Sequence, residues 1–276
     1  MRIWIVLAVI VLLILLYLFC LAPNMGRREE MRPFEEVYIA HRGLFDNHSE
    51  WPENSLPAFQ RAVDAGYGIE LDIQLTADHQ MVVFHDGNLK RMCGVDKMVY
   101  ECTYEELCRY TLLDSQQRIP LFRDVLEVIG GKVPLIVEVK SEGDWKETTR
   151  TMAEMMKGYR GVYCMESFHP LAVAWYRDNC PEVIRGQLST NYFKDEPKRS
   201  VWERIVLTNL LMNWRARPDF IAYNHKHVDQ FSYRVCRLFG VENVAWTIKN
   251  QKELEQAKRV FQVLIFDSFI PDRKEF

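Results

Sequence analysis

Ionisable side chains recur directly after short apolar runs of this sequence, at positions where a buried strand would end. The first five such sites are His41 and Arg42, Glu70 and Asp72, His85 and Asp86, Glu138 and Lys140, and Glu166 and Ser167. Carboxylates can hold a hard cation, and imidazoles can exchange protons near neutral pH. Arginine and lysine can bind an anion, so together these residue types could support chemistry on a charged ester.

The spacing of the carboxylates indicates a metal site. Residues two apart on a strand share a face, so Glu70 and Asp72 point the same way, as do Glu138 and Lys140. Carboxylates that converge in a region of low dielectric constant repel one another and need a counter-ion. Glu70, Asp72 and Glu138 therefore predict a divalent cation, for which Ca²⁺ and Mg²⁺ are equally suitable. No cysteine or histidine cluster with zinc-ligand spacing is present.

The remaining residues of this set predict acid–base and anion-binding roles. His41 and His85 could act as an acid–base pair, in which one ring takes a proton from an attacking hydroxyl and the other protonates the leaving oxygen. Arg42 and Lys140 are suited to phosphate oxygens. A metal, two cations and an acid–base pair are the groups expected for attack at a phosphodiester.

Each residue alone also has a structural interpretation. A single histidine at a strand end is commonly a hydrogen-bonded structural residue, and Glu138 with Lys140 could be a surface ion pair worth about 0–1 kcal/mol. However, these charges lie within apolar runs, where an unpaired charge is costly. Their recurrence after successive strands favours a site.

The elements that would position these residues alternate between short apolar runs and amphipathic stretches. Nine runs are candidate strands, at 37–41, 68–72, 81–85, 134–140, 162–167, 183–188, 219–224, 244–248 and 263–267. Helices are expected at 56–65, 121–130, 171–179 and 251–260. The alternation predicts a parallel sheet with helices outside, as a closed TIM (β/α)₈ barrel.

The ninth strand is one too many for that barrel. Only eight residues separate the runs at 68–72 and 81–85, which is too short for a helical crossover, so 81–85 is expected to return antiparallel and to bring His85 level with Asp72. A doubly wound open sheet is the alternative. It is disfavoured because no glycine-rich phosphate loop follows the first strand.

The N-terminus predicts a membrane anchor ahead of the barrel. Residues 3–22 are uncharged and mostly aliphatic, long enough for one transmembrane helix. A cleaved signal peptide is the alternative, but the apolar run exceeds the usual 7–15 residues and Ala22 precedes Pro23. We therefore expect an anchor at 1–22, a polar linker at 23–36 and a barrel domain at 37–276.

Composition places limits on partners and compartment. The formal charge of −3 shows no excess of basic residues, so nucleic acid is not an expected partner. Arg27, Arg28 and Arg32 follow the anchor whereas only Arg2 precedes it, which slightly favours a cytoplasmic barrel. Seven cysteines without a regular pattern agree with a reducing compartment. The side of the membrane stays open.

At these residues the sequence resembles the glycerophosphodiester phosphodiesterase family. The similar stretches, in order, are "HRG" at 41–43, "PENSLPAF" at 52–59, "GYGIELDIQLTADHQMVVFHD" at 66–86, "CTYEEL" at 102–107, "IPLFRDVL" at 119–126, "LIVEVK" at 135–140, "ESF" at 166–168 and "AWTI" at 245–248. The resemblance covers about residues 37–270. It implies a (β/α)₈ barrel that hydrolyses glycerophosphodiesters to glycerol 3-phosphate and an alcohol.

The resemblance also implies residue roles. By position, Glu70, Asp72 and Glu138 would hold the metal, and His41 and His85 would be the acid–base pair. Arg42 and Lys140 would bind phosphate, and Trp246 would pack against the glycerol, although a core role for this tryptophan is as plausible. Glu53 and Asn54 would order the mouth. The family mechanism uses the substrate's own hydroxyl as nucleophile and passes through a cyclic phosphate.

Several positions depart from the family pattern, and other functions stay open. Ser55 replaces the usual threonine, and Phe266-Asp267-Ser268 replaces the usual Thr-Asp near the C-terminus, so the role of 266–271 is unassigned. One alternative is a phospholipase D-like activity on lysophospholipids, for which Leu44, Phe45 and Trp51 are candidate residues of an apolar rim. Another is a catalytically silent barrel that acts as a binding module.

Overall fold

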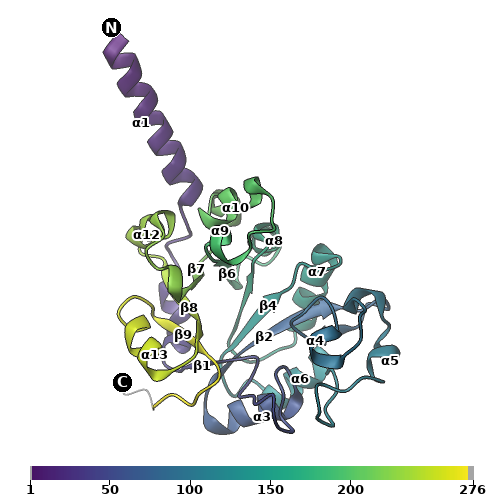
Figure 1. The fold of residues 1–276 in the computed structure, drawn as a ribbon. Coiled ribbons are helices and arrows are strands. Elements are labelled where there is room, and N and C mark those ends of the chain that lie inside the picture. The colour runs from purple at the N-terminus through teal and green to yellow at the C-terminus, as the bar shows by residue number, and fades with distance from the viewer. Residues whose placement is uncertain (1, 273–276) are drawn as a thin grey trace.

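The computed structural model describes residues 2–272, which form a barrel with one long helix projecting from it (Figure 1). The strands are β1 (Ile39–His41), β2 (Gly68–Leu75), β3 (Met81–Val83), β4 (Leu135–Val139), β5 (Tyr163–Ser167), β6 (Ile184–Ser189), β7 (Phe220–Asn224), β8 (Glu242–Ile248) and β9 (Val263–Phe266). The α-helices are α1 (Arg2–Leu21), α2 (Arg32–Glu35), α3 (Leu56–Ala65), α4 (Lys90–Cys93), α5 (Tyr104–Leu107), α6 (Phe122–Ile129), α7 (Trp145–Met156), α8 (Pro170–Asn179), α9 (Tyr192–Asp195), α10 (Val201–Thr208), α11 (Asn213–Ala216), α12 (Phe231–Leu238) and α13 (Gln251–Ala257). Short 3₁₀ turns are η1 (Arg28–Met31), η2 (Val99–Glu101) and η3 (His225–His227).

Eight of these strands close into a parallel barrel. The neighbours run β1-β2-β4-β5-β6-β7-β8-β9, and β9 pairs with β1 to complete the circle. The prediction of a TIM barrel is therefore confirmed, and the open doubly wound sheet is excluded. All nine candidate strands are present.

The surplus strand β3 lies antiparallel against the far end of β2, where Val83 pairs with Ile73. The next residue, Phe84, donates its backbone N–H to the carbonyl of Asp72 over 2.9 Å. This hydrogen bond places Phe84 opposite Asp72 and His85 one residue further on, so the antiparallel return brings His85 close to Asp72, within one residue of the predicted level.

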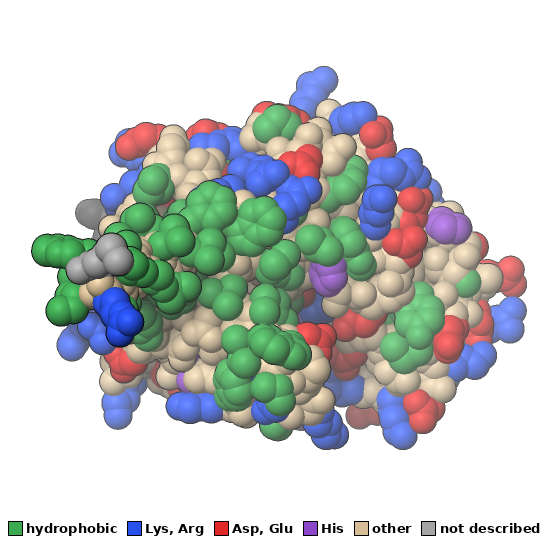
Figure 2. All heavy atoms as spheres, turned by 90° about the horizontal axis from the view of Figure 1, so that it is seen from above, with side chains coloured by type: hydrophobic (Ala, Val, Ile, Leu, Met, Phe, Trp, Pro, Cys, Tyr) green, Lys and Arg blue, Asp and Glu red, His purple; other side chains and the backbone are tan. Residues whose placement is uncertain are grey.

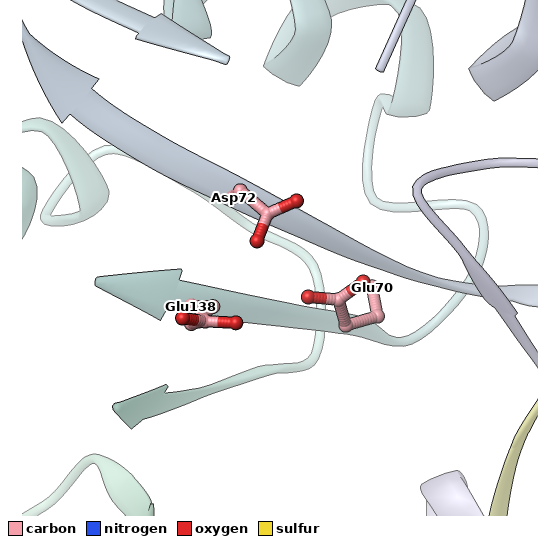
Figure 3. Close-up of side chains that lie close together, drawn as sticks. All are labelled: Glu70, Asp72 and Glu138. Atoms are coloured by element: carbon pink, nitrogen blue, oxygen red, sulfur yellow. The ribbon is translucent and has the colours of Figure 1, made fainter. Parts of the chain in front are cut away.

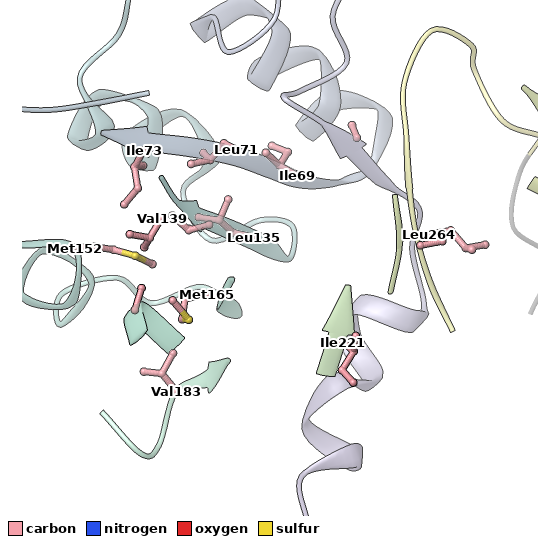
Figure 4. Close-up of a cluster of buried hydrophobic side chains, with 14 of the residues drawn as sticks. Ile69, Leu71, Ile73, Leu135, Val139, Met152, Met165, Val183, Ile221 and Leu264 are labelled. Atoms are coloured by element: carbon pink, nitrogen blue, oxygen red, sulfur yellow. The ribbon is translucent and has the colours of Figure 1, made fainter. Parts of the chain in front are cut away.

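Side chains on the outer face of the barrel pack under the surrounding helices. On β2 these are Ile69, Leu71 and Ile73, which are fully buried, and β4 contributes Leu135 and Val139 in the same way (Figure 4). The alternation predicted for β2 and β4 is therefore observed. Burying these aliphatic side chains stabilises the barrel by roughly 1.5–3 kcal/mol each.

Side chains on the inner face form two layers. The lower layer is apolar and includes Ile39, Ile136 and Phe220. Phe220 packs so close to Gly186 that a Cβ atom at residue 186 would lie 2.1 Å from its ring. The upper layer, at the C-terminal ends of the strands, carries the ionisable residues. The barrel is thus a packed core below and a polar mouth above.

Residues 23–36, expected to be a polar linker, fold against the opposite end of the barrel. Met31 in η1 and Phe34 in α2 are fully buried and pack with the lower layer of the interior. Asn24 donates its side-chain N–H to Asp219 over 2.6 Å. This segment closes the N-terminal end of the barrel, which we call the floor.

Helix α1 is long and apolar enough to cross a membrane, as judged from length and composition. Its C-terminal part contacts the barrel, where Phe19 stacks on Trp214 and Tyr17 stacks on Phe231 at ring-centroid distances of 6.3 and 6.4 Å. Phe231 begins α12, the helix that follows β7, and therefore lies at the mouth end. The helix thus runs past the mouth end and projects beyond it (Figure 1).

Candidate active site

Three carboxylates converge at the mouth of the barrel. Glu70 and Asp72 come from the inner face of β2 and Glu138 from the inner face of β4, where Asp72 and Glu138 are paired in register. One ligand oxygen from each lies within 4.8 Å of the others, and all three side chains are buried (Figure 3). The structure therefore brings together the three residues predicted to bind a metal.

Burial and neighbouring charges shift the pKa values of these three acids away from their usual range. Burial and the charges of Asp72 and Glu138 raise the pKa of Glu70 well above its usual value. Burial likewise raises the pKa of Glu138, although Lys140 opposes the change. Burial would also raise the pKa of Asp72, but the charges of His85 and Lys140 outweigh it and lower that pKa. A cluster in which acids compete for protons in this way favours binding a cation.

Two cations lie beside the cluster. The Lys140 Nζ is 2.9 Å from Glu138 and 3.5 Å from Asp72. The Arg42 guanidinium donates to Glu53 over 2.6 Å and lies 3.5 Å from Asp72. The residues predicted to bind phosphate are thus held at the mouth by carboxylates.

His41 ends β1 and is held by an aspartate from the last strand. Its Nδ1 lies 2.9 Å from an Asp267 carboxylate oxygen, and its Nε2 lies 3.9 Å from Glu70. Burial lowers the pKa of His41, against the hydrogen bond to Asp267. A lowered pKa favours a neutral ring near pH 7, and the Asp267 contact places the Nδ1 proton toward the aspartate.

His85 is held in a similar way on the other side of the mouth. Its Nδ1 lies 2.6 Å from Asp86, and Asp86 in turn accepts a 2.6 Å hydrogen bond from Arg91. Burial would raise the pKa of Asp86, but its hydrogen bonds to His85 and Arg91 lower it, so Asp86 stays ionised. Both predicted acid–base residues therefore have a carboxylate partner that orients the ring.

The two residues predicted to order the mouth connect these groups. Asn54 donates its side-chain N–H to Asp72 over 3.0 Å, and its backbone N–H donates to the Arg42 carbonyl over 3.0 Å. Glu53 accepts hydrogen bonds from Arg42 and Arg91, which hold its pKa at about 2 against the effect of burial. Asn54 thus orients a cluster carboxylate, and Glu53 orients a cation.

Two cavities open above the cluster and share Trp246. One of about 400 Å³ is lined by His85, Glu138 and Lys140, and the other, of about 460 Å³, by His41 and Arg42. Trp246 comes from the inner face of β8, and its ring meets Phe168 edge-on at 5.4 Å between centroids. It therefore lines the site and also packs against the apolar layer of the barrel interior.

Besides Asp86, three further residues belong to the site, beyond those predicted to act in it. Asp267 follows the strand pattern "VLIF" and could have been found by applying the strand-end rule to β9. Glu166, on β5 next to Glu138, is buried, and burial and Glu138 raise its pKa well above its usual value. Arg91 comes from α4, in the excursion between β3 and α6, and no periodic signal marks it.

The candidate apolar rim lies elsewhere than expected. Leu44, Phe45 and Trp51 are half-buried, and Arg61 covers the Trp51 ring at 4.2 Å. The exposed apolar side chains near the mouth belong instead to the segments that follow β5 and β6, such as Leu171 and Trp202. Exposure depends on which loops pack together, so the composition of one loop did not predict it.

Comparison with known proteins gives a consistent result. The model of the "Glycerophosphoryl diester phosphodiesterase family" matches residues 41–273. A lysophospholipase D GDPD1 of Rattus norvegicus is 32% identical across 92% of this chain and 90% of its own length. A putative glycerophosphodiester phosphodiesterase, YhdW, of Bacillus subtilis (strain 168) is 25% identical across 86% of this chain and 95% of its own.

Solved structures share the fold. An Oleispira antarctica phosphodiesterase in complex with the product sn-glycerol-3-phosphate is 24% identical, with a TM-score of 0.67 over 84% of this chain and 93% of its own. A glycerophosphodiester phosphodiesterase of Thermotoga maritima has the same identity and coverage of this chain, covers 95% of its own and has a TM-score of 0.63. At this identity the likeness concerns the fold of the barrel.

Proposed function

Because the chain belongs to the glycerophosphoryl diester phosphodiesterase family, we propose that it hydrolyses glycerophosphodiesters to glycerol 3-phosphate and an alcohol. The observation that carries this proposal is the buried cluster of Glu70, Asp72 and Glu138 between two carboxylate-oriented imidazoles. A silent binding barrel would not need to retain this costly arrangement of buried charge.

The cluster fits a hard divalent cation, Ca²⁺ or Mg²⁺. Its three ligands are carboxylates, as such ions prefer, and one oxygen of Asp72 is buried without a hydrogen-bond partner among the described residues. We assign Glu70, Asp72 and Glu138 as its ligands. When bound, such an ion would polarise a phosphoryl oxygen and favour ionisation of a nearby hydroxyl.

The residues of the chain then have distinct tasks. Arg42 and Lys140 bind the phosphate oxygens, and Trp246 packs against the glycerol backbone. One imidazole of the His41–His85 pair accepts the proton of the glycerol hydroxyl that attacks phosphorus, and the other protonates the leaving alkoxide. A five-membered cyclic phosphate and the free alcohol result. With the roles of the two rings reversed, water opens the cyclic phosphate to glycerol 3-phosphate.

The carboxylate partners of the two rings support this assignment. Asp267 and Asp86 accept hydrogen bonds from Nδ1 of His41 and His85, respectively, which leaves Nε2 of each ring for proton transfer. Because no protein nucleophile is needed, the mechanism agrees with a mouth that contains acids, cations and imidazoles.

The experiment is an assay of glycerol 3-phosphate release from glycerophosphocholine with and without a chelator. We expect activity that is lost on chelation and restored by Ca²⁺ or Mg²⁺. His41→Ala and His85→Ala should each lower kcat by at least about 10²-fold, since general acid–base catalysis contributes about 10²–10⁴-fold. His48→Ala is the matched control, because His48 is an exposed loop residue. Full activity in His41→Ala, or in the presence of chelator, would contradict the proposal.

A second candidate activity is release of the head group from lysophospholipids. The rat relative that carries the name lysophospholipase D is 32% identical over nearly the whole chain, and α1 projects from the mouth end. We propose that α1 is a single membrane-spanning anchor. Arg27, Arg28 and Arg32 favour a barrel on the cytoplasmic side.

A further inference from the structure

An apolar groove lies beside the mouth. It has a volume of about 350 Å³, and its apolar lining includes Phe168, Leu171, Trp202, Val206, Leu207 and Met212. The groove is formed where α8 meets the segment between β6 and β7, which carries α9, α10 and α11. A hollow with a largely apolar lining is a candidate site for an apolar ligand.

The groove is continuous with the active-site cavity. Four residues line both spaces, namely Ser141, Phe168, Tyr192 and Arg199. Phe168 forms the divide, since its ring faces Trp246 on the cavity side at 5.4 Å and lines the groove on the other. Each space is near the lower end of the volume typical of small-molecule sites, and together they form one extended site with a charged half and an apolar half.

Helix α1, the proposed membrane anchor, lies on the same side of the molecule as the groove. Trp214 of α11, in the same segment that forms one side of the groove, stacks on Phe19 of α1. Val201 and Trp202 beside the groove are 56% and 76% exposed, and Phe193 is 45% exposed. Figure 2 shows hydrophobic side chains spread over the face that also bears the hollow with acidic side chains. A bilayer around α1 would therefore lie near the open side of the groove.

We propose that this groove binds the acyl chain of a lysophospholipid whose phosphodiester lies between His41 and His85. The inference rests on the proposed function and extends it, because it assigns residues that distinguish a single-chain lipid from a water-soluble diester. When the head group of the lipid lies in the charged cavity, its acyl chain extends past Phe168 into the apolar groove. Occupation by the chain removes Leu171, Trp202 and Val206 from water. Each methylene so buried strengthens binding by about fourfold.

The test compares two substrates on one protein. Full-length protein in nanodiscs is assayed on 16-carbon lysophosphatidylcholine in the bilayer and on glycerophosphocholine in water. Val206→Trp fills the groove from the inner side of α10, and Val201→Trp, on the same helix but outside the groove lining, is the matched control. We expect Val206→Trp to lower kcat/KM for the lysophospholipid at least tenfold relative to glycerophosphocholine. Val201→Trp should change this ratio by less than twofold.

A second groove variant, at an exposed position, tests the proposal in case Val206→Trp fails to fold. Leu171→Glu places a charge at an exposed rim position, 41% accessible, and should lower the same ratio at least threefold. Equal losses on both substrates in both groove variants, or an unchanged ratio, overturn the groove proposal. Wild-type protein that hydrolyses glycerophosphocholine but not lysophosphatidylcholine also overturns it and leaves the proposed function standing. Wild-type protein inactive on both substrates overturns the proposed function itself.

Discussion

The two ends of the barrel both bury acids, but they neutralise them differently. At the floor, Asp219 accepts hydrogen bonds from Asn24 and from the backbone N–H of Arg185, and the Arg185 guanidinium lies 3.5 Å away. Glu242 pairs with Arg28 at 2.5 Å. Each buried acid at the floor therefore has its own cation from the chain.

The mouth has more acids than cations. Three cations, Arg42, Lys140 and Arg91, lie there among six buried carboxylates, which are Glu53, Glu70, Asp72, Glu138, Glu166 and Asp267. The pKa values of Glu70 and Glu166 are raised well above their usual range, chiefly by burial. A buried acid with an internal partner is structural, whereas a surplus of buried acids is maintained for a ligand that brings positive charge.

The largest effect should come from removing one charge at the mouth. Glu70→Gln preserves shape but deletes a ligand of the proposed cation, so we expect kcat/KM to fall by at least about 10³-fold, corresponding to ~4 kcal/mol. In chelator, the free energy of unfolding should stay the same or rise, because repulsion with Asp72 is relieved. Steady-state kinetics and urea denaturation measure the two effects. Activity above a tenth of wild type would place the cation elsewhere.

At the floor the same kind of change should act on stability instead. Asp219→Ala leaves Arg185 buried without its partner, so we expect a loss of about 3–5 kcal/mol in the free energy of unfolding. Activity per folded molecule should remain within about twofold. Asp178→Ala is the control, since its pair with Arg215 is half-exposed and worth about 0–1 kcal/mol. Equal destabilisation by the two variants would mean that the floor pair is no more important than a surface pair.

The smallest effect is a pH dependence at the floor. Burial and Glu35 raise the pKa of Glu242 to about 7, from an ordinary value near 4.5. The folded state thus holds a proton that the unfolded state has released, so stability falls as pH rises from about 4.5 to 7 and stays low above it. Glu242→Gln should abolish ~1–2 kcal/mol of this fall, because the exposed Arg28 offsets part of the burial cost.

Denaturation at pH 5 and pH 8 measures this difference. The experiment should be done with Ca²⁺ or Mg²⁺ present, because the raised pKa values of Glu70 and Glu138 contribute in the same direction in metal-free protein. A Glu242→Gln variant with the same pH dependence as wild type would show that Arg28 already keeps Glu242 ionised.

The alternation of side chains along strands made the barrel and most of the mouth predictable. Glu70 and Asp72, or Glu138 and Lys140, must share the inner face once Leu71 and Val139 are placed in the outer layer. The return of β3 followed from chain length alone. Asp267 obeys the same rule and was left unassigned only because the neighbouring residues depart from the family pattern.

Other features depend on contacts that have no local signal. Arg91 reaches Glu53 from a helix 38 residues later in sequence. Met31 and Phe34 are two apolar residues in a charged stretch, which by itself is typical of a linker, and only the open end of a barrel makes them core residues. The groove arises from two segments that follow different strands, so its exposure could not be inferred from either one.

The last residue of helix α1 is part of the barrel core, so removal of the helix by a peptidase would affect the stability of the barrel. Leu21 ends α1 and is fully buried in the outer core. Its carbonyl accepts hydrogen bonds from Asn213 at 3.0 Å and Cys236 at 3.5 Å. A peptidase that cut after Ala22 would leave a hole in that core and a buried amide unpaired. Soluble versions of the enzyme should therefore begin upstream of Leu21, because a chain without this residue would lose the stabilisation that these contacts provide.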